Sequence, residues 1–205
     1  QDLYVDDPLL RTNLARGLAI DARAMAAGDA ETPVSRRDLT GLGQAIGRLM
    51  TGRAGADVVA LSSDGWDTHV GQDDQLRRRL AGLDQLIAGL KTALGPEWSS
   101  TAVVVATEFG RTARVNGTRG TDHGTASTLM VMGGAVRRGG LIGDWPTLAA
   151  NRLFEDRDVA PTLDVRSVFK SVLREQLGVD RAALDSRVFP DSAAEAPVYE
   201  GLLRA

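Results

Sequence analysis

Apolar residues recur along the chain with two periods, one typical of helices and one typical of buried strands. Residues 72–94 show the clearest helical pattern, because large apolar side chains repeat at alternating steps of four and three: Leu76, Leu80, Leu83, Ile87, Leu90 and Leu94. The dipeptide Gly95-Pro96 is expected to end this helix. Short apolar runs at 57–62 (DVVALS) and 101–107 (TAVVVAT) flank it, and each is typical of a buried strand. A strand, a helix and a strand in this order predict a parallel pair.

Other segments extend this pattern. Residues 7–27 are rich in Leu, Ala and Arg and are expected to be helical. Ser35 is expected to cap a second helix, with Asp38 near its positive end. One face of that helix is apolar, formed by Leu39, Leu42, Ile46 and Leu49.

The chain after residue 126 predicts one strand and one helix. Residues 127–132 (STLMVM) are a third strand candidate. Asp158 is expected to cap a final helix with Pro161 in its first turn and Gly178 past its end. The chain after Leu184 is polar and is expected to be extended. We therefore predict a helical N-terminal segment over 1–55, an α/β core over 56–190 and a tail over 191–205.

The composition of the chain excludes several classes of protein. The 205 residues are 43% apolar, which is enough for a packed core in one sizeable domain. A net charge of −3 gives no electrostatic attraction to nucleic acid, so no nucleic-acid partner is expected. The absence of cysteine excludes disulfides and thiolate chemistry. No apolar run approaches the ~20 residues of a transmembrane helix, and the first residues, QDLYVDDPLL, lack the features of a signal peptide.

The expected strand ends gather polar residues, including the only two histidines of the chain. Ligands bind beyond the carboxyl ends of strands in open parallel α/β sheets, so these loops are expected to converge. The residues concerned are Asp64, Asp67, His69, Glu108, Arg111, Asp122 and His123.

This residue set is typical of a divalent metal site. Asp67 and His69 are two apart, so an extended chain points both side chains the same way. Zinc or manganese would suit such ligands first, with calcium as a further alternative. The expected ligands are Asp67, His69, His123 and either Glu108 or Asp122. Asp122 could instead orient His123, and Arg111 or Arg114 would hold an oxyanion.

Structural interpretations of the same residues remain open. Asp64-Gly65 is an ordinary turn sequence, and Trp66 is expected to serve packing. Asp122 can cap a backbone turn within its loop. Glu108 and Arg111 can form a simple ion pair. The nucleotide-binding patterns G-x-G-x-x-G and P-loop are absent from the first strand-to-helix turn.

Several motifs together resemble a known family. They are GWDTHVGQ, VVVATEFGRTARVNGTRGTDHGTASTLMVMGGAV, GGLIGDWPTL and DVAPTLDVRSVF. The chain resembles, over about 35–190, the exported, sulfatase-like domain-of-unknown-function family fifteen-oh-one. This resemblance places it with alkaline phosphatases, sulfatases and cofactor-independent phosphoglycerate mutases, and implies an alkaline-phosphatase-like fold with three α/β/α layers and a mostly parallel sheet.

The resemblance also implies roles for residues. Asp67 and His69 match a metal-binding pair before a long helix, and His123 matches a later metal histidine. Glu108-Phe109-Gly110 stands where many relatives have Asp-His-Gly, so Phe109 replaces a ligand. Residues 158–162 match a segment whose role is structural. The family's N-terminal metal Asp and nucleophile have no match before Asp57, so the chain resembles a C-terminal half and the fold is expected to be incomplete.

These features predict part of a metal-dependent hydrolase of phosphate or sulfate esters. The resemblance implies a periplasmic or extracellular location and an anionic ester as substrate. The missing N-terminal half, or another secreted protein, is a further expected partner. The alternative is a non-catalytic exported protein that kept the fold and serves binding or assembly.

Overall fold

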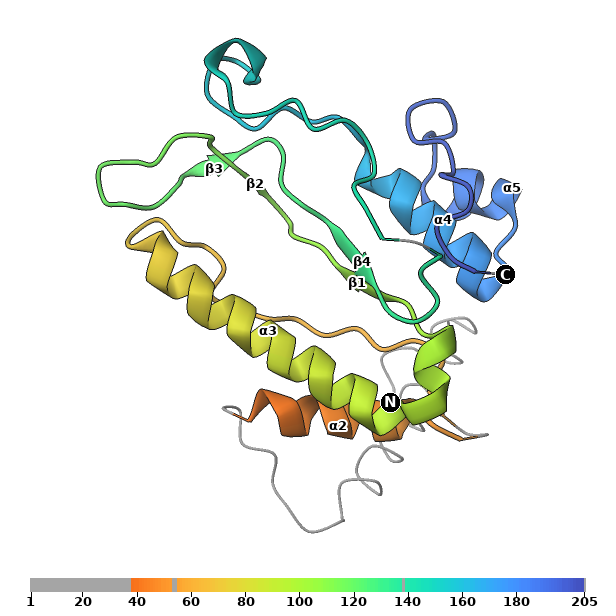
Figure 1. The fold of residues 1–205 in the computed structure, drawn as a ribbon. Helices are drawn as coiled ribbons and strands as arrows, with labels where there is room; N and C mark the ends of the chain where they lie inside the picture. Colours follow the sequence, from red (N-terminus) through yellow and green to blue (C-terminus); the bar gives the residue numbers. More distant parts are fainter. Residues whose placement is uncertain (1–37, 53–54, 138, 205) are drawn as a thin grey trace, which may run out of the picture. The chain divides into compact units, whose positions relative to one another are not determined.

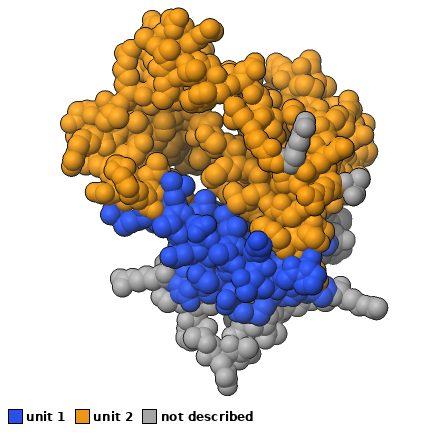
Figure 2. All heavy atoms as spheres, viewed as in Figure 1, with its two compact units in different colours: residues 1–64, 78–96 blue, residues 65–77, 97–205 orange. Residues whose placement is uncertain are grey.

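The computed structural model describes residues 38–52, 55–137 and 139–204 (Figure 1). The helix predicted at 7–27 and the predicted cap Ser35 lie outside these residues. The chain divides into two compact units, coloured separately in Figure 2. The first comprises Gln1–Asp64 and Arg78–Pro96, and the second Gly65–Arg77 and Glu97–Ala205.

The first unit contains a pair of helices. Helix α2 (Leu39–Met50) begins after Asp38, whose carboxylate accepts a hydrogen bond from the amide of Gly41 at 2.8 Å. Helix α3 (Gln72–Leu94) has the predicted bounds, and its first turn belongs to the second unit. It ends where Gly95 adopts a left-handed φ of 54°, a conformation that glycine reaches at low cost.

Glycines bring these two helices into backbone contact. A Cβ atom at Gly43 would collide with the carbonyl oxygen of Leu86, and one at Gly89 with that of Thr40. Leu90 and Leu94 are buried on the same helix. The packing of α2 against α3 therefore depends on the absence of side chains at Gly43 and Gly89 as much as on the leucines.

The first predicted strand is wrong. Residues 57–62 form no strand, and Val58, Val59 and Leu61 are 64%, 40% and 51% exposed. β-Branched residues favour an extended chain, but a strand also needs a neighbour for its backbone groups. Within the described ranges no segment pairs with it.

The second unit contains two short antiparallel ladders. Strand β1 (Val103–Val105) pairs with β4 (Met130–Met132), with Val104 opposite Val131. Between them in sequence, β2 (Gly110–Arg111) pairs with β3 (His123–Gly124), with Arg111 opposite His123. Figure 1 shows the four strands as successive parts of one long hairpin.

This topology contradicts the predicted fold class. The second and third predicted strands exist around β1 and β4, but they pair with each other in antiparallel fashion. The described residues contain no mostly parallel sheet and no alkaline-phosphatase-like α/β/α layers. The parallel arrangement required a strand at 57–62, and without it the chain joins β1 to β4 through a hairpin, which needs no helical crossover.

The last of the predicted helices begins later in the structure than in the prediction. Helix α4 (Val165–Leu177) starts after Asp164, which accepts a hydrogen bond from the amide of Arg166 at 2.8 Å. It ends at Gly178, as predicted, with a φ of 68°. Asp158, the predicted cap, is instead a buried loop residue that accepts hydrogen bonds from Thr125 and from the side chain of Arg157.

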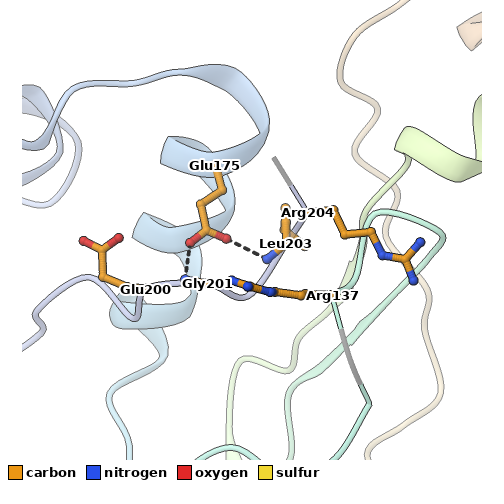
Figure 3. A pocket seen from close by; sticks show the side chains of 6 residues that line it. All are labelled: Arg137, Glu175, Glu200, Gly201, Leu203 and Arg204. Atoms are coloured by element: carbon orange, nitrogen blue, oxygen red, sulfur yellow. Dashed lines mark hydrogen bonds between the residues drawn. The ribbon is translucent and has the colours of Figure 1, made fainter.

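The chain after Leu184 returns to the core of the second unit, where we had expected an extended segment. Ala135 and Val168 pack with Leu202 and Leu203, and all four are buried. Glu175 on α4 accepts backbone hydrogen bonds from Gly201 and Leu203, each at 2.6 Å (Figure 3).

A fully buried lysine holds this returning segment. Lys170 on α4 is 0% exposed, and its ammonium donates to the Asp185 carboxylate at 2.5 Å. It also donates to the carbonyls of Ser192 and Ala196, at 3.2 and 2.8 Å. The three protons of the ammonium therefore have three acceptors, which makes burial of the charge tolerable.

Short helical turns complete the described chain. They are η2 (Gly95–Ser100), η3 (Ala150–Arg152), α5 (Arg181–Ala183) and the π-helical turn η4 (Leu184–Val188). Across the part of the chain that the structure describes, none of the helices has the length and apolar character of a bilayer-spanning segment.

Substitution Gly43→Ala tests the helix contact. We expect a loss of about 1–3 kcal/mol in the free energy of unfolding, because the new methyl group must displace the backbone of α3. Gly82→Ala is the matched control, since its Cβ would meet only the end of the Leu39 side chain, at 2.6 Å. Urea unfolding followed by circular dichroism measures both variants. Equal losses would contradict the close approach.

Substitution Asp164→Asn tests the charge at the start of α4. Asparagine caps as well as aspartate, so we expect a loss of about 0.3–1 kcal/mol at neutral pH from the missing charge. The Arg166 side chain lowers the pKa of Asp164 below its ordinary 3.8. The advantage of wild type is therefore expected to be complete above that ordinary pKa, to decline below it, and to be lost once the pH has fallen through the lowered value. Urea unfolding over a pH series measures the difference, and a pH-independent difference would contradict this role.

Candidate metal centre

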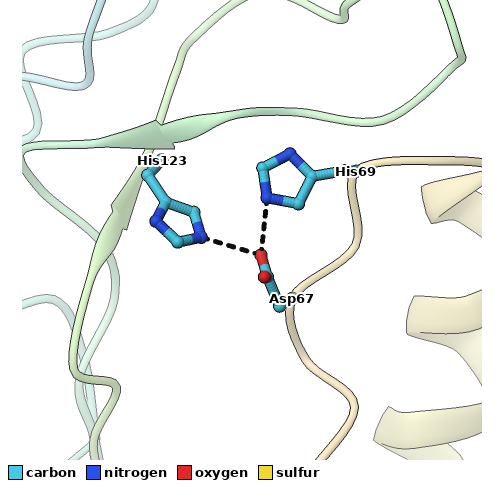
Figure 4. Close-up of side chains that lie close together, drawn as sticks. All are labelled: Asp67, His69 and His123. Atoms are coloured by element: carbon cyan, nitrogen blue, oxygen red, sulfur yellow. Dashed lines mark hydrogen bonds and ion pairs between the residues drawn. The ribbon is translucent and has the colours of Figure 1, made fainter.

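One carboxylate oxygen of Asp67 is the meeting point of the site. The Nε2 atoms of His69 and His123 both lie 2.9 Å from Asp67 Oδ1 (Figure 4). Each of the three residues offers one ligand atom, and these atoms lie within 4.8 Å of one another. Asp67 and His69 come from the extended segment before α3, and His123 comes from β3. The structure thus brings both histidines to one acid within the second unit.

Backbone contacts hold these two segments together. The amide of Thr121 donates to the carbonyl of Thr68, and the amide of Gly71 donates to that of Thr118. Thr68, between Asp67 and His69, is itself buried. A Cβ atom at Gly120 would collide with the backbone of His69, so only glycine permits this approach.

Arg111 closes the group from β2. Its Nη2 atom donates to Asp67 Oδ1 at 2.9 Å and to the carbonyl of Trp66 at 2.8 Å, while Nη1 donates to the carbonyl of Thr121 at 2.8 Å. Its side chain is only 17% exposed. The hydrogen bond from His123 lowers the pKa of Asp67, and His69 and Arg111 lower it further. The carboxylate of Asp67 therefore stays ionised.

Asp122 lies on the other side of the His69 ring. Its Oδ1 atom is 3.0 Å from Nδ1 of His69, the nitrogen turned away from Asp67. The predicted choices for Asp122 were a metal ligand or a partner of His123, and the structure places it against His69. Asn116, which sequence reasoning missed, donates to the same Asp122 oxygen at 2.9 Å. Hydrogen bonds from Asn116 and then from His69 lower the pKa of Asp122.

An aromatic ring covers His123. Phe109 stacks on it with ring centroids 4.2 Å apart and planes 13° apart. The guanidinium carbon of Arg111 lies 5.0 Å from the Phe109 ring centroid. Phe109 therefore supports the His123 ring by stacking on it.

Glu108 takes no part in this group. Among the described residues, the acids and histidines close enough to share an ion are Asp67, His69 and His123. Glu108 is exposed, two residues before β2 begins. The predicted fourth position is thus supplied by neither Glu108 nor Asp122.

The donor set fits a divalent cation. One carboxylate oxygen and two imidazole nitrogens match the three protein ligands of a catalytic zinc site, and they also suit manganese. The histidine side chains are 41% and 53% exposed, which leaves an open side for a further ligand.

Comparison with known proteins identifies a family and nothing narrower. Residues 10–188 match the family described as "Protein of unknown function (DUF1501)". No curated protein and no solved structure matches the chain. Because the match covers most of the 205 residues, the chain is a member of the DUF1501 family.

Proposed function

We propose that this chain is part of a metal-dependent hydrolase of phosphate or sulfate esters. The observation that carries the proposal is the group of Asp67, His69 and His123, whose ligand atoms lie within 4.8 Å of one another. These residues would hold a divalent cation, zinc or manganese before calcium. Such a cation activates water and stabilises negative charge on a transferring group.

The surrounding residues suit this chemistry. Arg111 keeps Asp67 directed at the two imidazoles and adds positive charge beside the group. An anionic ester would approach from the exposed side of the histidines, where one positive side chain already faces the site. The guanidinium of Arg111 already donates to Trp66, Asp67 and Thr121. If Arg111 also holds the substrate, as we predict, the same group must serve both the protein and the substrate.

Kinship with sulfatases and alkaline phosphatases is proposed from the sequence motifs alone. The antiparallel ladders of the second unit do not support it. Export to the periplasm or the exterior, and pairing with a missing N-terminal half or another secreted protein, are proposed on the same resemblance.

A second candidate function is a non-catalytic binding or assembly protein. Two observations favour it: Phe109 stacks on His123 where relatives have a ligand, and Arg111 already donates to three protein oxygens. Such a protein would bind metal for structure and hydrolyse nothing.

Substitution His69→Ala tests the metal centre. We expect zinc and manganese to bind at least ~100-fold more weakly, because loss of a ligand should exceed the 10–100-fold cost of losing a supporting partner. Isothermal titration of the metal-free chain measures affinity, and hydrolysis of p-nitrophenyl phosphate and p-nitrophenyl sulfate measures activity with the metal supplied.

Glu108→Gln is the matched control for this experiment. Glu108 is an acid of the same region that lies outside the group of possible ligands. The metal affinity and the hydrolysis rate of Glu108→Gln should therefore equal those of wild type. Equal metal binding by wild type and His69→Ala would overturn the metal centre. Metal binding without hydrolysis of either ester would favour the non-catalytic candidate.

Substitution Arg111→Lys separates two roles of the arginine. Lysine keeps the charge but lacks the planar fork that reaches three oxygens at once. We expect about tenfold weaker metal binding, because Asp67 loses the contact that directs it. A raised KM with unchanged metal affinity would instead assign Arg111 to the substrate alone.

A further inference from the structure

We propose that Asp122, held in place by Asn116, is a positioning residue that keeps the proton of neutral His69 on Nδ1 and leaves Nε2 for the cation. The inference rests on the proposed metal centre. It concerns residues that do not touch the cation and act through His69.

The position of the His69 ring creates a choice between two acids. Nε2 lies 2.9 Å from Asp67 Oδ1, and Nδ1 lies 3.0 Å from Asp122 Oδ1. A neutral imidazole has one N–H, so it can donate to one of these oxygens only. The nitrogen without the proton then directs its lone pair at an oxygen, unless a cation lies between them.

The existing contacts favour the proton on the Asp122 side. Asp67 Oδ1 already lies 2.9 Å from His123 Nε2 and 2.9 Å from Arg111 Nη2. Asp122 Oδ1 has one other donor, Asn116 Nδ2 at 2.9 Å. The less satisfied oxygen is the better acceptor for the His69 proton. A histidine that ligates metal through one nitrogen commonly donates the other N–H to a carboxylate in this way.

Asn116 fixes the orientation of Asp122. Its Oδ1 atom accepts from the amides of Thr118 and Gly120, each at 3.0 Å. These two bonds determine which end of the amide is oxygen, because a flipped side chain would direct its NH₂ group at two N–H donors. The Nδ2 atom must therefore face Asp122 and the carbonyl of His69, to which it donates at 3.1 Å. The Asn116 side chain thus connects the 116–120 turn to the backbone of His69 and to the carboxylate of Asp122.

The experiment observes the tautomer directly. The chain has only two histidines, so a long-range ¹H–¹⁵N spectrum resolves both rings, and the His123→Ala spectrum assigns them. In metal-free wild type, at a pH where the rings are neutral, we expect the His69 proton on Nδ1. In Asp122→Asn, the amide can donate to Nδ1 and favour the Nε2–H form. Zinc affinity of that variant is expected to fall 10–100-fold.

Two further variants complete the test. Asn116→Asp keeps the acceptor for Thr118 and Gly120 but repels Asp122, so it should change tautomer and affinity in the same direction as Asp122→Asn. Glu195→Gln is the matched control for loss of one charge, because the Glu195 side chain is 73% exposed and pairs with Arg166. It should change neither quantity.

The outcomes separate this inference from the proposed function. An Nε2–H tautomer in wild type would overturn the inference, as would an Asp122→Asn variant that matches Glu195→Gln in tautomer and affinity. If wild type shows the Nδ1–H tautomer and Asp122→Asn changes it, while zinc does not bind wild type, the positioning role is supported and the metal centre is not. Urea unfolding of each variant shows that the comparison is made on folded protein.

Discussion

The two-residue ladder between β2 and β3 is the constraint on which the site depends. It places Arg111 opposite His123, and side chains opposite each other in an antiparallel pair lie on the same face. The arginine then reaches the segment before α3 through the carbonyl of Trp66 and the carboxylate of Asp67. A shift of the register by one residue would turn one of the two side chains to the other face and dissolve the group. Two backbone pairings thus decide which face of the ladder Arg111 and His123 present to Asp67.

Local patterns predicted the helices well and the sheet poorly. The leucine repeat of α3 and the glycine that ends α4 carry their own information, because a helix satisfies its backbone within one segment. A strand depends on a partner elsewhere in the chain. Nothing in the sequence at 57–62 or at 101–107 indicates which segment that partner is. The same limit explains the misplaced cap: Asp158 and Asp164 have the same side chain, and only tertiary contacts to Thr125 and Arg157 distinguish the buried loop residue from the cap.

The site was partly predictable for a related reason. Two histidines beside aspartates are rare enough in this chain to suggest a common purpose, and the two do converge on Asp67. The parallel sheet from which we expected this convergence is absent from the described residues, so the expectation was right for a wrong structural reason. Asn116 gave no comparable signal, because an asparagine in a turn is an ordinary residue. Phe109 stood out only as the replacement of a ligand, and its stacking on His123 could not be read from the sequence. Glu108 illustrates the opposite error, since an acid in a suggestive sequence position faces solvent in the structure.

The buried ammonium of Lys170 has a consequence for how the second unit can be cut. Its three acceptors are distributed over Asp185, Ser192 and Ala196, so the residues beyond α4 act as the counter-charge of the helix and not as an appendage. A protease that removed this stretch would leave a cation in an apolar interior, at a cost of several kcal/mol for the unpaired ion. The helix would then have to unfold or turn its lysine outward, which makes residues 185–196 inseparable from the domain that they close.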